Sequence, residues 1–292
     1  PAPVPERPPA MKTMKSLIAS TAALPFLLTS CIVSPDWQTG NGVSVTEVRD
    51  LPVFSRVDLE APVQVTIKTG REYAAYVTGD GNLVDYFETE ASGGVLTISQ
   101  AYAVNPVVEP HITVVVPDLR SVVHNGMGRV SIEEDGDFPD LSLTLNGGGE
   151  IHFAGTASRL RAELNGTGGI YAEGYAAFLE AVLRGQGEIS AENLLTADAE
   201  VELSGSGNVY LDLDYGAGLD LALSGSGRVE WWGQPASLEY DLSGTGKVIE
   251  HRGLPKKTAN AKVAAKMASG PAQAKARTAT AADKPYEMVN GK

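Results

Sequence analysis

A glycine-containing heptapeptide recurs seven times between residues 124 and 248 and limits the possible folds of this chain more than any other feature. Its later copies read LRGQGEI, LSGSGNV, LSGSGRV and LSGTGKV. The first glycines of successive copies are 21, 19, 19, 20, 20 and 19 residues apart. A repeat of about 20 residues is typical of solenoids, in which each repeat forms one coil that stacks on its neighbour.

Hydrophobic and polar residues alternate around each glycine pair. Apolar side chains lie two, four and six residues before the first glycine and four residues after it, as Leu141, Leu143, Leu145 and Ile151 do around Gly147. These offsets are all even, so the segments are β-strands with one buried face. The pattern predicts an all-β protein, a parallel β-helix (β-solenoid) whose rungs of about 20 residues stack about 4.8 Å apart.

The repeated glycines share the inward phase of the alternation. We expect each pair to form a tight corner, where glycine removes a core-directed side chain and permits a positive φ. A second corner is expected at Gly155, Gly174 and Gly233. The glycines of the first corner are Gly126, Gly128, Gly147, Gly149, Gly166, Gly168, Gly185, Gly187, Gly205, Gly207, Gly225, Gly227, Gly244 and Gly246.

Polar residues precede the first glycine of most copies and form another repeated row. The row begins with Asn125, Asn146 and Asn165 and continues with serines at 204, 224 and 243. These side chains could form hydrogen-bonded ladders along the stack. They are equally compatible with a simple preference of turns for small polar residues.

A candidate ligand face follows from the outward row five residues after each first glycine. This row includes His152, Tyr171 and Tyr210. Trp232 also has an odd offset, so we expect it to point outward near one end of the row. Tyrosine rings offer flat surfaces with a polar tip that suit stacking on a sugar or on a partner protein. The alternative is that tyrosine is present only because it favours strands.

The N-terminus has the pattern of a lipoprotein signal. After an upstream extension, a positively charged start at Met11 or Met14 leads into an apolar segment that is too short to span a bilayer. It ends in Leu28-Thr29-Ser30-Cys31, which looks like a lipobox. We expect residues 1–30 to be removed, Cys31 to carry the lipid anchor and residues 31–42 to form a flexible tether. An ordinary secretory signal with a chance cysteine is the alternative.

The charge distribution separates an acidic body from a basic tail. The formal net charge is −13, which argues against nucleic acid as a partner. Residues 32–254 contain 12 Lys and Arg residues against 33 Asp and Glu residues. Residues 255–292 contain eight basic and two acidic residues in an Ala- and Lys-rich segment, which we interpret as a disordered tail.

No motif in the sequence predicts catalysis, a cofactor or a transition-metal site. The four histidines lack metal-binding spacing, and His124 is expected to be an inward residue at the first rung. The repeated Gly-x-Gly is not followed by a helix, as a phosphate-binding loop would be. The acidic run 133–137 could bind calcium, but it matches no calcium motif, so a solvated turn is the alternative that we favour.

Residues 43–120 lack the glycine pairs but contain several alternating segments, which predict strands within 53–70, 72–79, 94–100 and 111–119. Phe54-Ser55-Arg56-Val57 leads into Val63–Ile67, Gly94–Ile98 follows, and Val114–Leu119 comes just before the glycine series. In this order and spacing, residues 43–254 resemble the head GIN domain family. The resemblance implies a right-handed parallel β-helix exported to the bacterial envelope, a role in adhesion by the family's name only, and no catalytic residues.

Taken together, these features predict a cell-envelope lipoprotein that presents a β-helical binding or adhesion module without catalysis. Its expected partners are the membrane, through the lipid anchor, and a glycan or an envelope or surface protein. Because the residue after Cys31 is Ile32 rather than an acidic residue, the outer membrane is favoured in a Gram-negative sorting system. A structural envelope protein without a ligand and a polysaccharide-active β-helix enzyme are the alternatives.

Overall fold

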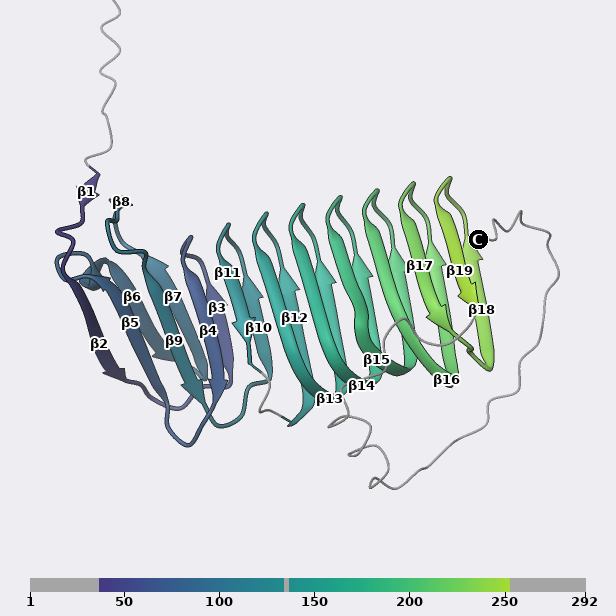
Figure 1. Ribbon diagram of the computed structural model, residues 1–292, viewed down its shortest axis with the longest axis horizontal. Helices are drawn as coiled ribbons and strands as arrows, with labels where there is room; N and C mark the ends of the chain where they lie inside the picture. The colour runs from purple at the N-terminus through teal and green to yellow at the C-terminus, as the bar shows by residue number, and fades with distance from the viewer. Residues whose placement is uncertain (1–36, 134–136, 253–292) are drawn as a thin grey trace, which may run out of the picture. The chain divides into compact units, whose positions relative to one another are not determined.

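The computed structural model describes residues 37–133 and 137–252 (Figure 1). The signal peptide 1–30, the lipidation site Cys31 and the basic tail 255–292 therefore lie outside the described residues, and so do residues 134–136 of the acidic run. Those expectations stay predictions.

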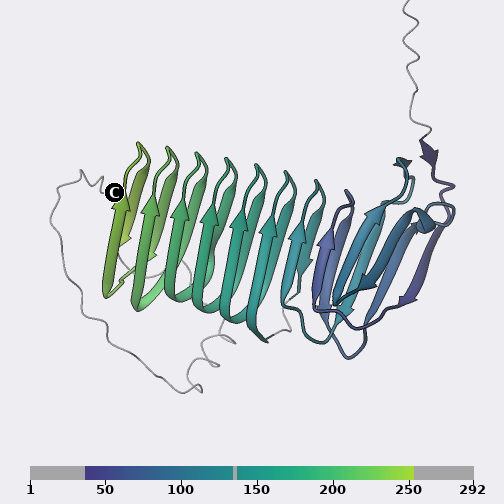
Figure 2. The ribbon, with the colours of Figure 1, turned by 180° about the vertical axis from the view of Figure 1, so that it is seen from behind.

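Residues 121–252 form the coils of a parallel β-solenoid, as the glycine repeat predicts. The strands follow one another along the stack, and Figure 2 shows the same order from behind. They are β10 (Ser121–His124), β11 (Arg129–Ile132), β12 (Asp137–Leu145), β13 (Glu150–Leu164), β14 (Gly169–Leu183), β15 (Glu188–Leu203), β16 (Asn208–Leu223), β17 (Arg228–Gly233), β18 (Ser237–Leu242) and β19 (Lys247–Arg252). All pairings among them are parallel, and equivalent residues of successive repeats lie opposite each other, as Leu145, Leu164 and Leu183 do.

The N-terminal part contains the predicted strands and adds antiparallel pairing that the repeat did not predict. Its elements are β1 (Gln38–Thr39), β2 (Ser44–Asp50), β3 (Arg56–Leu59), β4 (Gln64–Thr69), β5 (Ala74–Asp80), η1 (Val84–Tyr86), β6 (Phe87–Ser92), β7 (Val95–Gln100), β8 (Val104–Asn105) and β9 (His111–Val116). Strands β3 and β4 form a coil that stacks in parallel on β10 and β11. Strand β5 pairs antiparallel with β2 and β9, and β6 pairs antiparallel with β7.

The last part of the expected tether 31–42, from Gln38 to Gly42, contacts the folded body, and the remainder of the tether stays a prediction. Strand β1 pairs in parallel with β8. The Gly42 N–H donates a hydrogen bond of 2.6 Å to Oδ1 of Asp80, a carboxylate that is 1% exposed. The same carboxylate accepts hydrogen bonds from the backbone N–H groups of Val107 and Val108, and these three bonds lower its pKa despite burial. The folded body therefore begins before residue 43.

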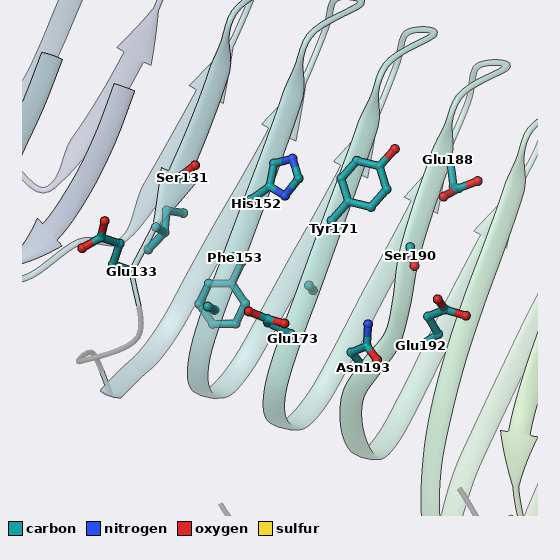
Figure 3. Close-up of a pocket in the computed structure, with 13 residues that line it drawn as sticks. Ser131, Glu133, His152, Phe153, Tyr171, Glu173, Glu188, Ser190, Glu192 and Asn193 are labelled. Atoms are coloured by element: carbon teal, nitrogen blue, oxygen red, sulfur yellow. The ribbon is translucent and has the colours of Figure 1, made fainter. Parts of the chain in front are cut away.

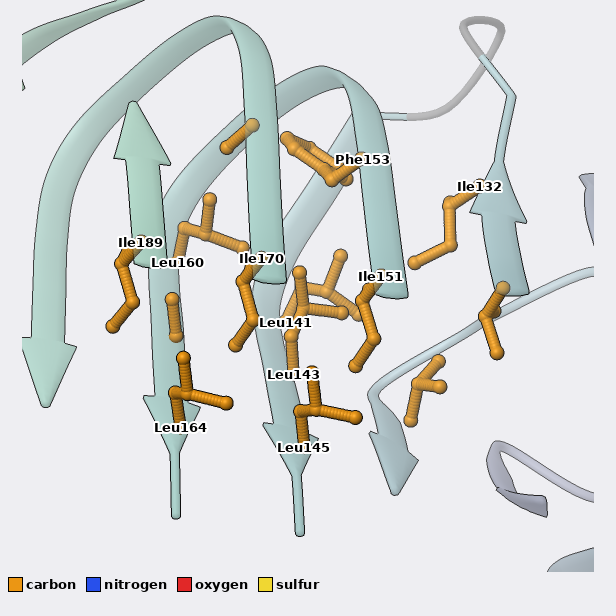
Figure 4. Packing of buried hydrophobic residues seen from close by; sticks show 14 of the residues in the cluster. Ile132, Leu141, Leu143, Leu145, Ile151, Phe153, Leu160, Leu164, Ile170 and Ile189 are labelled. Atoms are coloured by element: carbon orange, nitrogen blue, oxygen red, sulfur yellow. The ribbon is translucent and has the colours of Figure 1, made fainter. Parts of the chain in front are cut away.

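The core is a set of ladders of identical or similar side chains, one from each coil (Figure 4). One ladder consists of Val130, Ile151, Ile170 and Ile189, and each of these side chains is at most 1% exposed. Burial of one such side chain contributes roughly 1.5–3 kcal/mol. In the final coil Tyr240 is 37% exposed, because no described coil covers its outer side. The inward phase predicted from the even offsets is thus confirmed, with the final coil as the exception.

Glycine is required at the first corner because stacked backbones touch there, and the expectation of a positive φ is wrong. None of the repeated glycines has a positive φ. Instead, a Cβ placed on Gly147, Gly166 or Gly185 would lie closer than 3.0 Å to the carbonyl oxygen of the equivalent glycine in the coil beneath. At the second corner Gly174 and Gly233 do have positive φ values, of 114° and 122°.

His124 lies inward as expected, and the asparagines of the polar row form the ladder that was one of the two alternatives. His124 is fully buried, with Nε2 2.8 Å from the carbonyl oxygen of Gly128 and Nδ1 accepting a bond from the Gly126 N–H. The amide of Asn146 donates to Asn125 at 2.8 Å, and that of Asn165 donates to Asn146 at 3.0 Å. The asparagines therefore form a hydrogen-bonded ladder, while a ladder of the serines stays a prediction.

Candidate functional site

The row predicted as a ligand face is a continuous outward ladder on the strands that follow the glycine corner. Register places His152 opposite Tyr171, Tyr171 opposite Ser190 and Ser190 opposite Tyr210. All four side chains are half-buried. Because they lie on consecutive strands of one sheet, their spacing along the stack is fixed by the backbone hydrogen bonds at about 4.8 Å per coil.

The aromatic part of this row is held in place by contacts on its N-terminal side. The rings of His152 and Tyr171 stack with centroids 4.9 Å apart and an angle of 26° between their planes. Nε2 of His152 lies 2.9 Å from Oε2 of Glu150, and Arg129 approaches the same oxygen to 2.7 Å. These hydrogen bonds, from His152 and then from Arg129, lower the pKa of Glu150. One face of Tyr171 is therefore covered by a partner of fixed orientation.

Gly169 provides the space in which the Tyr171 ring lies. A Cβ on Gly169 would come within 2.6 Å of the tyrosine ring and hydroxyl. The Tyr171 ring therefore leans back along its own strand and covers Gly169, two residues earlier. Gly169 lies in an outward row that otherwise holds charged or amide side chains at equivalent positions, including Glu150, Glu188 and Asn208. The sequence pattern alone did not connect the glycine with the tyrosine.

The row borders an open groove with a volume of about 790 Å³. Figure 3 shows the rings of His152 and Tyr171 side by side, and Glu188, Ser190 and Glu192 in succession on the next strand. The groove is lined by Ser131, Ile132, Glu133, His152, Phe153, Ala154, Tyr171, Ala172, Glu173, Glu188, Ser190, Glu192 and Asn193. Among these lining residues there are four glutamates and neither Lys nor Arg, so the groove is acidic.

Sequence reasoning did not assign the glutamates to the ligand face, although Glu133 begins the acidic run that was considered for calcium. Glu133 and Glu173 lie seven residues after a first glycine, as Trp232 does, so the same phase argument that selected Trp232 would have found them. Glu133 forms an ion pair of 3.0 Å with Lys68. Burial, and then the charge of Glu192, raises the pKa of Glu188.

Trp232 lies apart from His152 and Tyr171. Its ring stacks on His251 with centroids 4.6 Å apart and planes 6° apart, and Nε2 of His251 lies 2.6 Å from Oε1 of Glu230. Register places Trp232 opposite Asp212, in a different row from Tyr210. The neighbouring Trp231 points inward, since that side chain is 1% exposed. The four residues of the predicted face are thus divided between a row and a separate stacked pair.

Asp212 is buried although its odd offset predicts an outward side chain. A register shift after Ala191 places Asp212 opposite Leu195, and the carboxyl is 2% exposed. Its Oδ1 has no hydrogen-bond partner among the described residues. Burial, and then the charge of Asp214, raises the pKa of Asp212 to about 7. The shift is local to the second corner, because the register before it (Ala191 opposite Leu211) and after it (Asp198 opposite Gly218) is the same, so the glycine period does not report it.

Within residues 37–133 and 137–252, no group of three or more His, Cys, Asp or Glu side chains is arranged to hold a metal ion. The same residues include no helix that is long and apolar enough to cross a membrane. Neither observation assigns a role to the groove.

Comparison with solved structures shows that the fold is shared. A protein from Bacteroides fragilis NCTC 9343 described as a "putative adhesin" matches with a TM-score of 0.61 at 19% identity, over 73% of this chain and 99% of the other. A "putative lipid binding protein" from Parabacteroides distasonis ATCC 8503 matches with a TM-score of 0.57 at 20% identity, over 73% and 98% of the two chains. A "putative adhesin" from the same strain gives 0.57 at 18% identity, over 74% and 100%.

The sequence comparison identifies the family. No curated protein matches the chain in sequence. A family model described as "Putative auto-transporter adhesin, head GIN domain" matches residues 53–235, which is more than half of the chain and includes β3 to β17 together with the groove. The chain therefore belongs to the head GIN domain family.

Proposed function

We propose that the protein is a cell-envelope lipoprotein, anchored through Cys31, that uses the groove face of its β-helix for binding and performs no catalysis. The observation that carries the binding role is the groove itself, in which a stacked aromatic pair and several carboxylates line about 790 Å³ on a rigid sheet. Ligand sites combine apolar or aromatic surface with a few placed polar groups in this way.

The names of the family and of its structural neighbours support binding to a partner outside the cytoplasm. Those names refer to adhesins and, in one case, to a lipid-binding protein. The lipobox at Leu28–Cys31 supports export and anchoring, with the outer membrane as the expected location. A glycan or an envelope or surface protein is the expected partner.

A first experiment tests the binding face. The double substitution Tyr171→Ala and Tyr210→Ala removes both tyrosines of the row, and we expect cell adhesion by the mature full-length protein to be lost. Tyr215→Ala is the matched control, because Tyr215 is 84% exposed and lies outside the groove. Unchanged thermal unfolding shows that each variant is folded. Full adhesion by the folded double variant would exclude the row as the binding face and leave the structural role.

A second experiment tests the anchor. Cys31→Ala removes the only cysteine of the chain and with it the acylation site. We expect the variant to be found in the soluble fraction or uncleaved, without label from a radioactive fatty acid. A variant that remains lipid-labelled in the membrane fraction would show that Cys31 is not the anchor.

The groove also favours one alternative, cleavage of a polysaccharide. Glycosidases use two carboxyl groups, of which the acid has a raised pKa, and Glu188 beside Glu192 has this character. Release of reducing ends from polysaccharides by the wild type but not by Glu188→Gln would replace the non-catalytic proposal with this one.

A further inference from the structure

Glu188 differs in its contacts from two other glutamates of the coils, Glu150 and Glu163. Glu150 is bound by His152 and Arg129, and Glu163 accepts hydrogen bonds from Arg161, Asn165 and Arg184. These contacts lower the pKa of both residues. Glu188 has no hydrogen bond or ion pair with another described residue, and burial raises its pKa instead. This carboxylate is half-buried and lacks a cation.

Two tyrosines flank this carboxylate along the stack. Register places Glu188 between Gly169 and Asn208, which precede Tyr171 and Tyr210 by two residues on the neighbouring strands. The Tyr171 ring leans back over Gly169, which brings it beside Glu188. After burial, the charge of Glu188 is the first cause that raises the pKa of each tyrosine. Tyr171 therefore lies beside Glu188, and Tyr210 lies two residues along the next strand from Asn208, the residue that pairs with Glu188.

The spacing of the two tyrosines suits a compact cation. Because they lie two coils apart, about 10 Å separates their positions along the stack. A group held midway is about 5 Å from each ring, as the His152 ring is from Tyr171 at 4.9 Å. An ammonium group within about 6 Å of an aromatic centroid gains cation–π attraction, and aromatic cages of this kind recognise quaternary ammonium ligands. Ser190, which lies between the two tyrosines in the row, is small and leaves this space open.

We propose that Tyr171, Glu188 and Tyr210 form a binding site for an organic ammonium group. The ligand supplies the cation that Glu188 lacks, and the two tyrosines flank that cation. The negative charge of the groove disfavours acidic ligands, because the residues that line it include four glutamates and no Lys or Arg. The inference rests on the proposed binding function and assigns its ligand chemistry. An amino sugar, a choline headgroup and a lysine side chain share this chemistry.

Isothermal titration of the mature full-length protein with choline and with its neutral isostere 3,3-dimethyl-1-butanol tests the charge requirement. We expect choline to bind at least about tenfold more tightly. Glu188→Gln is expected to weaken choline binding about tenfold while leaving the fold intact, because it removes a charge that has no partner. Tyr171→Ala and Tyr210→Ala are each expected to weaken it at least about threefold, and Tyr215→Ala to leave it unchanged. Equal binding of the isostere, or full binding by Glu188→Gln, would overturn the proposal.

Three further probes distinguish the sources of the cation. These are glucosamine against N-acetylglucosamine, phosphatidylcholine vesicles against vesicles of an acidic lipid, and a lysine peptide against its acetylated form. Preferential binding of the member that carries the ammonium group, in any pair, supports the site and names the source. Preference for the other member in every pair contradicts it. Loss of adhesion in the double tyrosine variant without ammonium binding would leave the proposed function and exclude this ligand. Ammonium binding that does not affect adhesion would support this ligand site and exclude adhesion through the row.

Discussion

The first and second corners of each coil show how differently one chain can turn. At the first corner the Gly-x-Gly turns follow one another every 19 to 21 residues, and equivalent residues lie directly above each other. The carbonyl oxygen of Gly166, for example, accepts a hydrogen bond of 3.1 Å from the N–H of Gln186 in the next coil. At the second corner the register shifts between Tyr171 and Glu173, and again between Ala191 and Leu195.

This difference follows from what lies beneath each turn. At the first corner of the coils from Gly147 onward, a backbone carbonyl of the coil beneath occupies the place of a Cβ, so the first glycine of each turn cannot be replaced without moving the backbone. At the second corner extra residues leave the stack, as Tyr215 does at 84% exposure. Variation is therefore confined to the second corner and to the outward rows, and the groove residues Glu192 and Asn193 lie where the register shifts.

The largest expected effect is at the first corner. A Cβ on Gly205 would lie closer than 3.0 Å to the carbonyl oxygen of Gly185, so Gly205→Ala forces two stacked backbones apart. We expect the free energy of unfolding to fall by at least about 3 kcal/mol, and by more for valine. Denaturant unfolding measures this.

Gly126→Ala is the matched control for that substitution. A Cβ on Gly126 would lie 3.3 Å from the His124 ring and 3.6 Å from the Ala61 carbonyl oxygen, because the turn beneath is Ala61-Pro62-Val63. We expect a loss below about 1 kcal/mol. Equal losses at Gly126 and Gly205 would show that stacking contact does not explain the glycine requirement.

The second largest effect concerns Asp212 and depends on pH. Because burial raises the pKa of Asp212 to about 7, the folded protein resists its ionisation. Well below pH 4 the carboxyl is protonated in both the folded and the unfolded state. As the pH rises from about 4 to about 7 the unfolded state ionises first, so the free energy of unfolding falls by roughly 2–4 kcal/mol. Asp212→Asn should remove this dependence and stabilise the protein at pH 8. A variant with the wild-type dependence on pH would show that Asp212 does not cause it.

A smaller effect is expected for Gly216 at the second corner. Its φ is 87°, and a Cβ there would contact nothing within 4 Å. Gly216→Ala therefore introduces backbone strain without a clash, and we expect a loss of about 1 kcal/mol in denaturant unfolding. A loss as large as that of Gly205→Ala would mean that the second corner is as closely constrained as the first.

The smallest effect is expected from lengthening the second corner. Two serines inserted after Tyr215 extend a segment that already leaves the stack, so the cost is the entropy of a longer loop, roughly 0.5 kcal/mol. The same insertion after Gln186 should prevent the coil from stacking and abolish cooperative unfolding. Similar outcomes at both sites would remove the distinction between the corners.

The candidate site was predicted only in part. The sequence indicates the row of His152, Tyr171 and Tyr210, because a period of two gives the direction of each side chain. It did not indicate that Trp232 would pair with His251 instead, or that Glu188 would lie between the two tyrosines. Those relations depend on which coils lie next to each other and on how far each ring leans along its strand.

The sequence by itself determined the coil length, the inward rows and the parallel stacking, because these repeat every 19 to 21 residues and are read from spacing alone. Only the tertiary structure decided the antiparallel pairing of β2, β5 and β6, the burial of Asp212 and the reason for the glycines. Each of these depends on contacts between segments with no common period. The glycines illustrate the physical reason most clearly, since their requirement comes from the carbonyl of the coil beneath and not from their own backbone angles.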